Sequence, residues 1–223
     1  TNSNRLRGHL NMSNIEDINL DVHLIEHLPI PAPMLPDLHY LSFSSKLENS
    51  LRRNLQLDEP MEVVEVADEN GNTLSSQDQL PLIQNELLEL LQEGEATNAK
   101  LLAYDPKRKT KATTEYLRYI QRVQTVMITM LLPLYDPLYG IDLRETIYET
   151  VLKKNHDYGN SFDKVVDQYG LAGAMIRITD KVNRLTTLLT TKATVKDEST
   201  LDTFLDILGY MSLIINYYED EED

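Results

Sequence analysis

The stretch GAMIRITDKVNRL, residues 173–185, has the clearest pattern of an amphipathic helix in the sequence. Four charged side chains in this stretch recur at i, i+3, i+4 and i+7, so a helix places them on one face. They are Arg177, Asp180, Lys181 and Arg184. The helical pattern continues on both sides, from residue 171 to residue 189. We therefore predict a helix that presents a mostly basic face.

A second C-terminal helix is predicted from Asp197 to about Tyr218, and it carries an acidic stripe at i, i+4 and i+8. The stripe consists of Glu198, Asp202 and Asp206. Like charges at this spacing repel by a few tenths of a kcal/mol per pair, so something positive is expected opposite them. Oxygen ligands at helical spacing suit Mg²⁺ or Mn²⁺. The alternative is that the basic face of the 173–185 helix pairs with the aspartates, while Glu198 complements its own helix dipole.

Shorter helices are expected at residues 142–154 and 162–170, with earlier ones from Asp78 to Gly94 and from Thr113 to Leu132. Between the helices expected at residues 113–132 and 142–154, Pro133, Pro137 and Gly140 are expected to interrupt the chain. One small β-hairpin is expected, because Met61–Val66 is rich in β-branched residues and is followed by the turn dipeptide Asn70-Gly71. The fold class is therefore predicted to be mainly α.

Three segments are predicted along the chain. Residues 1–60 are expected to form an irregular arm, since four prolines between Pro29 and Pro36 exclude a helix or a central strand there. Residues 61–140 would contain the hairpin and the first helices. Residues 141–223 would form an all-α domain that ends in an acidic tail. The basic run from Lys107 to Lys111 is interpreted as a solvated loop that could also meet phosphate.

Charge and composition exclude several classes of function. The chain has 21 basic and 36 acidic residues, a net charge of −15, and the acidity is spread over both halves, so direct nucleic-acid binding is not expected. There is no cysteine, which excludes thiol nucleophiles and thiolate metal sites. Without a membrane-length apolar run or a signal pattern, we expect a cytoplasmic protein with no membrane partner.

Several of these residues occur in an order that resembles a known family. The pattern begins at Lys154-Asn155-x-Asp157-Tyr158-Gly159 and continues through Arg177-x-x-Asp180-Lys181-x-x-Arg184-Leu185. It ends with Asp197-Glu198-Ser199-x-x-Asp202-Thr203-x-x-Asp206 and Tyr210. Residues 142–218 resemble the nucleotide modification associated domain family, which is often phage-encoded and similar to the MazG-like nucleotide pyrophosphatases. The Glu-x-x-Glu and Glu-x-x-Asp metal motifs typical of the MazG class are absent from this part of the chain.

The resemblance implies a MazG-like helical domain acting in nucleotide or modified-DNA metabolism of a bacterial or phage-infected cell. It implies a hydrolase that converts (deoxy)nucleoside triphosphates to monophosphate and pyrophosphate with Mg²⁺ or Mn²⁺, and a homo-oligomer. Asp180 and Asp202 would be catalytic, and Glu198, Asp202 and Asp206 would hold the metal. The nucleotide would contact Asp157, Tyr158, Arg177, Lys181 and Arg184.

Two alternatives remain open from the residues themselves. Asp157 and Tyr158 would contact a nucleotide base by edge recognition and stacking, or they would form a turn that packs on the domain. The chain as a whole would hydrolyse or bind a nucleotide, or it would be a non-catalytic interaction module, such as a phage protein bound to a host partner. Acids and bases gathered around one cleft would favour nucleotide chemistry, whereas acids spread over an outer face would favour the interaction module.

Overall fold

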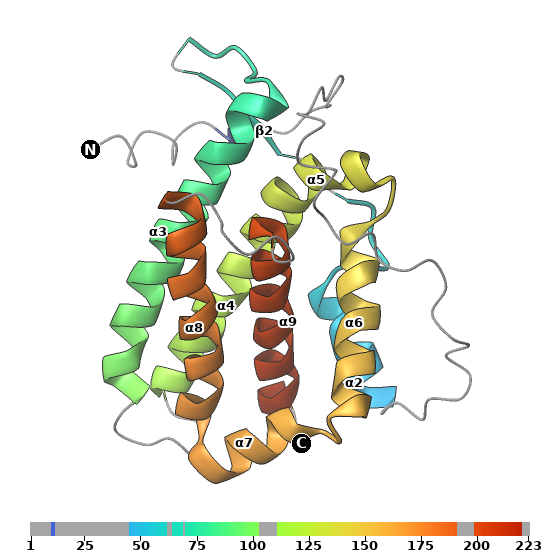
Figure 1. Cartoon of the computed structure of the whole chain (residues 1–223), viewed down its shortest axis with the longest axis vertical. Helices are drawn as coiled ribbons and strands as arrows, with labels where there is room; N and C mark the ends of the chain where they lie inside the picture. The colour runs from blue at the N-terminus through green and yellow to red at the C-terminus, as the bar shows by residue number, and fades with distance from the viewer. Residues whose placement is uncertain are drawn as a thin grey trace.

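The protein is mainly α-helical, as the sequence predicts (Figure 1). A computed structural model of the chain describes residues 10–11, 45–61, 64–68, 70–102, 111–190 and 199–219. The helices are α2 (Ser45–Asn54), α3 (Ser76–Leu102), α4 (Lys111–Val126), a π-helical turn (Met127–Leu131), α5 (Leu132–Tyr139), α6 (Leu143–Asp157), α7 (Ser161–Tyr169), α8 (Leu171–Thr190) and α9 (Thr200–Glu219). The strands are β1 (Leu10–Asn11) and β2 (Glu65–Val66).

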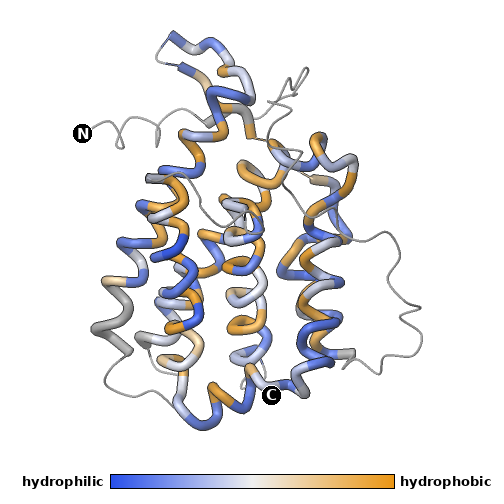
Figure 2. Tube along the Cα trace, viewed as in Figure 1, coloured by the Kyte–Doolittle hydropathy of each residue, from blue (hydrophilic) through white to orange (hydrophobic). Residues whose placement is uncertain are grey.

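Helix α9 forms the centre of the bundle, and α8, α2, α4 and α6 pack around it. Its buried side chains recur around the whole helix, as expected for an element with neighbours on every side. They include Leu201, Phe204, Ile207, Leu208, Met211, Ile214 and Ile215. Helix α7 crosses the lower end of the bundle in Figure 1 and joins α6 to α8. Along α6 and α8, hydrophobic and hydrophilic positions alternate with helical spacing (Figure 2), so each presents an apolar stripe to the core.

The C-terminal helices begin and end close to where the sequence places them, because their caps are local. Asp142 caps α6 by accepting a hydrogen bond from the backbone nitrogen of Arg144 at 2.9 Å. Gly159 (φ 58°) and Asn160 (φ 56°) adopt left-handed backbone conformations that turn the chain into α7. Ser199 caps α9, although residues 191–198 before it lie outside the described residues.

Gly94 does not end a helix, contrary to the prediction, because α3 continues to Leu102. Its lack of a side chain serves packing instead. A Cβ built at Gly94 would lie 2.0 Å from the Tyr119 ring, whose hydroxyl donates to the Leu91 carbonyl at 3.2 Å. The Tyr119 ring therefore occupies the space that a side chain at position 94 would need, in the contact between α3 and α4.

Pro133 and Pro137 do not interrupt the chain where expected, since both lie within α5. A proline blocks the carbonyl four residues earlier, which for Pro133 is that of Thr129 in the π-helical turn. That carbonyl accepts a hydrogen bond from the backbone nitrogen of Val64 at 3.2 Å instead. Gly140 does end α5, in a left-handed conformation with φ 63°.

Residues 1–60 are not wholly irregular as predicted, because they contain the helix α2. Helix α2 buries Leu47 and Leu51 against α9, and Leu55 follows one turn later, a spacing of i, i+4 and i+8. The proline segment at 29–36 lies outside the described residues, as do residues 107–110 and the acidic tail from 220.

The predicted hairpin is not confirmed as a two-stranded ribbon. Strand β2 pairs antiparallel with β1, and the residues after the Asn70-Gly71 turn add only an isolated bridge between Ala67 and Thr73. The predicted boundary at Gly140 does not divide the core, because one cluster of buried side chains includes residues on both sides of it. That residues 141–223 fold independently stays a prediction.

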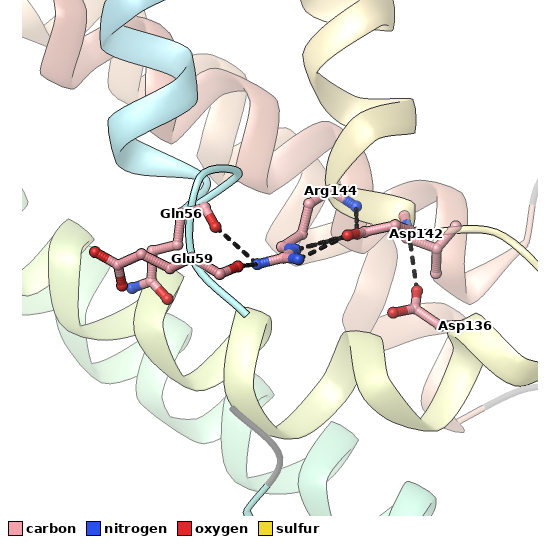
Figure 3. A network of polar contacts seen from close by, with 6 residues as sticks. Gln56, Glu59, Asp136, Asp142 and Arg144 are labelled. Carbon is pink, nitrogen blue, oxygen red and sulfur yellow. Dashed lines mark hydrogen bonds and ion pairs between the residues drawn. The ribbon is translucent and has the colours of Figure 1, made fainter. Parts of the chain in front are cut away.

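Arg144 joins the start of α6 to the chain that follows α2 (Figure 3). Its guanidinium donates to both carboxylate oxygens of Asp142 and to the carbonyl oxygens of Gln56, at 2.8 Å, and Glu59, at 3.3 Å. The side chain is 6% exposed, so these bonds compensate the cost of burying its charge. Nearby, burial raises the pKa of Asp136 to about 6, and this carboxyl group accepts from the Leu143 nitrogen.

Within the described ranges, no single helix is both long and apolar enough to cross a membrane. Residues 113–139 and 143–157 meet the same criterion only as a pair, bent by 93° at the break between them.

Candidate functional site

A cavity of about 650 Å³ lies between α6, α8 and α9, with α7 and the end of α5 contributing to its wall. In Figure 1 the three long helices stand side by side, with α9 between α8 and α6. Because α8 and α9 run antiparallel, residues early in α8 lie level with residues late in α9. The cavity therefore has two ends, one near the start of α9 and one near α7.

A cluster of ion-paired side chains lines the cavity. Asp206 from α9 accepts from the Lys181 ammonium of α8 at 2.7 Å and from the Lys154 ammonium of α6 at 3.3 Å. Lys181 and Asp206 are about a third exposed or less, whereas Lys154 is 56% exposed. One carboxylate thus connects the two outer helices through the central one.

Two arginines extend the basic row along α8. Arg177 lies one turn before Lys181, and Arg184 lies one turn after it; both line the cavity. Arg177 is exposed and makes no hydrogen bond or ion pair with any residue that the structure describes. The cavity is therefore lined by four cationic and two anionic side chains, although the whole chain carries a net charge of −15.

At the end near the start of α9, Asp202 has a structural role. Its Oδ2 accepts from the backbone nitrogen and the hydroxyl of Ser199, and the Ser199 hydroxyl oxygen accepts from the Asp202 nitrogen at 3.0 Å. This reciprocal pair is a capping box, which satisfies two helix-end donors. Tyr139 lines the same end, and its buried hydroxyl has no hydrogen-bond partner among the described residues. Burial and the charge of Asp202 raise the pKa of Tyr139 to about 12.

Aromatic side chains line the opposite end, close to α7. Phe162 of α7 stacks on Tyr210 of α9 with 6.4 Å between ring centroids. Tyr158, in the turn between α6 and α7, also lines the cavity and is 68% exposed. A large aromatic ring left in solvent beside basic groups is suited to stacking on a planar ligand.

The structure brings together most of the residues predicted for a site. The cavity is lined by Tyr158, Arg177, Lys181, Arg184, Asp202 and Asp206. Two predicted residues are not part of its lining: Asp180 is exposed on α8, and Asp157 is exposed beside His156. Glu198 lies outside the described residues.

The remaining acids do not fit a divalent metal as they are arranged here. Both Asp206 oxygens face lysine ammonium groups, and Oδ2 of Asp202 is used in the capping box. Searching the residues with described positions finds no group of three or more metal-binding side chains. The pairing of Asp206 with Lys181 corresponds to the alternative in which protein cations balance the acidic stripe.

Several residues that line the cavity were not predicted as site residues, and Lys154, Tyr139, Phe162 and Tyr210 are among them. Lys154 lies three residues after the buried Val151, so it shares the side of α6 that faces the cavity, and its place at the start of the family pattern is the sequence signal for it. Tyr139 precedes the Gly140 turn, and only the packing of α5 against α6 brings it to the cavity.

One comparison with known proteins covers the helices that line the cavity. Residues 154–216 match the family model described as nucleotide modification associated domain 1, a segment that starts in α6 and ends in α9. No curated protein and no solved structure matches the chain. The matched segment contains all four cations and both acids of the cavity. This segment, from Lys154 to Asn216, is therefore similar to the nucleotide modification associated domain 1 family.

Proposed function

We propose that the protein binds a phosphate-bearing nucleotide in the cavity between α6, α8 and α9. The observation that carries this proposal is the charge of the lining. Four cationic side chains gather around one cavity in a chain that is otherwise strongly acidic. A concave site with a concentrated positive potential attracts an anion of several charges.

The basic row supports contacts with a polyphosphate. From Arg177 to Arg184 it extends about 10 Å along α8, at 1.5 Å per residue. Guanidinium groups pair with phosphate oxygens in a bidentate manner, and a lysine adds a point charge between them. Arg177 is already available for such a contact, since no described residue holds it.

The aromatic end supports contacts with the base. The Phe162–Tyr210 pair forms one wall, and the exposed Tyr158 ring can cover a base at the cavity mouth. Stacking of a base on an aromatic side chain contributes about 1–3 kcal/mol and tolerates different bases. The arrangement therefore favours a nucleotide over inorganic phosphate alone.

Hydrolysis to monophosphate and pyrophosphate, with Mg²⁺ or Mn²⁺ and a homo-oligomer, stays a prediction from the resemblance to MazG-like enzymes. Asp202 and Asp206 would have to leave their present partners to hold a metal. Binding without this rearrangement is the function that the geometry supports best. Pyrophosphate release from a panel of nucleoside triphosphates with each metal would test the hydrolase.

Calorimetric titration with canonical and modified (deoxy)nucleoside triphosphates tests the binding proposal. Arg177→Ala should weaken binding about tenfold to a hundredfold, the loss of one charge-assisted hydrogen bond, without lowering stability. Arg122→Ala is the matched control, since Arg122 is exposed on α4 and does not line the cavity. Equal affinities for the two variants would contradict the proposal. Failure of the wild-type protein to bind any member of the panel would favour the interaction module instead.

A further inference from the structure

Asp206 bridges two lysines that line the cavity. Its two carboxylate oxygens accept from ammonium groups on opposite walls, Lys181 of α8 and Lys154 of α6. A phosphate that bridged α6 and α8 would present the same kind of oxygen to the same two donors. The carboxylate and the ligand therefore compete for one pair of cations.

No other acid of the lining shares this position. Asp202 lies one turn earlier in α9, and the Oδ2 atom of its carboxylate is held by Ser199. The two lysines are only partly buried, so their ammonium groups can exchange partners without moving a helix.

We infer that Asp206 is an internal counter-ion that weakens and thereby sets the affinity of the cavity for phosphate-bearing ligands. This inference rests on the proposed nucleotide binding and adds a residue that determines affinity. When the ligand binds, both lysines transfer their hydrogen bonds from the carboxylate to phosphate oxygens. Asp206 then faces the bound anion as an unpaired like charge.

The size of the effect follows from that repulsion. Two unit charges about 6 Å apart interact by about 1.4 kcal/mol at an effective dielectric constant of about 40, between the surface and bulk-water values, which is a factor of about ten in affinity. Neutralising Asp206 should therefore strengthen binding about tenfold. If Asp206 were a metal ligand, neutralising it would instead weaken the binding of any ligand that requires the metal.

The test is calorimetric titration of the full chain with inorganic tripolyphosphate in EDTA, repeated with Mg²⁺. Asp206→Asn and Asp206→Ser should each bind about tenfold more tightly than the wild-type protein in EDTA. Asp206→Glu, which keeps the charge, should not bind more tightly. Glu93→Gln removes the same charge from an exposed position on α3 outside the lining, and it should change the affinity less than twofold.

Circular dichroism and thermal unfolding of each variant establish that the fold is retained. Equal or weaker binding of tripolyphosphate by both neutral variants, with wild-type binding intact, would overturn the inference alone. A loss of Mg²⁺-dependent binding in Asp206→Asn would overturn it in favour of a metal ligand. No binding of tripolyphosphate or of any nucleotide by the wild-type and variant proteins would overturn the proposed function as well.

Discussion

Glu95 should make the protein less stable as the pH rises from about 4.5 to about 7, and Glu95→Gln should remove this dependence. The side chain is 7% exposed and lies between α3, α4 and α8. Its carboxyl group accepts from the Tyr116 hydroxyl at 3.0 Å and from the Thr179 hydroxyl at 3.5 Å. No cation is among the causes of its pKa shift, and burial raises the pKa from 4.5 to about 7.

The magnitude follows from this change in pKa. Between pH 4.5 and pH 7 the folded protein holds a proton on Glu95 that the unfolded chain releases, so the free energy of unfolding falls as the pH rises. Each pKa unit corresponds to about 1.36 kcal/mol, so the cost of ionising Glu95 is roughly 3 kcal/mol above pH 7 and is absent below pH 4.5. Glutamine keeps an oxygen for Tyr116 and cannot ionise.

Urea denaturation at pH 4.5 and pH 8 measures the effect. Glu95→Gln should be within about 1 kcal/mol of the wild-type protein at pH 4.5 and more stable by roughly 3 kcal/mol at pH 8. Glu93→Gln, at an exposed position on the same helix, should show no such difference between the two pH values. A Glu95→Gln variant that is less stable than wild type at pH 8 would refute the reasoning, because it would show that the charged form is favourably held.

Three further substitutions test local features of the fold. Arg144→Ala should lower the free energy of unfolding in urea by about 3 kcal/mol, since it leaves two backbone carbonyls and a carboxylate without their donor. Gly94→Ala should lower the thermal midpoint, with a loss of about 1–3 kcal/mol from the clash with the Tyr119 ring, and unchanged stability would contradict this packing. Asp202→Asn should cost about 1 kcal/mol in thermal unfolding, and the cost should disappear in a Ser199→Ala background if the two residues form a capping box.

The C-terminal helices could be predicted because their signals are local. Apolar spacing and caps such as Ser199 act within a turn or two, so α6, α7, α8 and α9 begin and end near the predicted residues. The spacing of the charged residues in α8 also predicts that Arg177, Lys181 and Arg184 share one face. In the structure all three line the cavity.

Features that depend on distant contacts could not be predicted in this way. Gly94 was predicted to end a helix, but it packs against the ring of Tyr119. The local sequence pattern does not show this contact, because Tyr119 lies 25 residues later in the chain. Pro133 was predicted to interrupt the helix. The helix continues because the Thr129 carbonyl, which loses its helical donor at Pro133, accepts from the distant Val64 instead. Lys154 and Asp206 both belong to the family pattern in the sequence, but only the packing of α6 against α9 shows that they form an ion pair.

Nuclear magnetic resonance titration of the ¹⁵N-labelled chain with a non-hydrolysable nucleoside triphosphate tests most directly whether the cavity is a nucleotide site. We predict saturable shifts in the amide signals of residues 150–162, 177–184 and 201–213, which include the basic and aromatic residues that line the cavity. Signals from the outer face of α3, including Glu89 and Glu93, should stay in place. Saturable shifts centred on α3 or α4, with those three segments unchanged, would contradict the account.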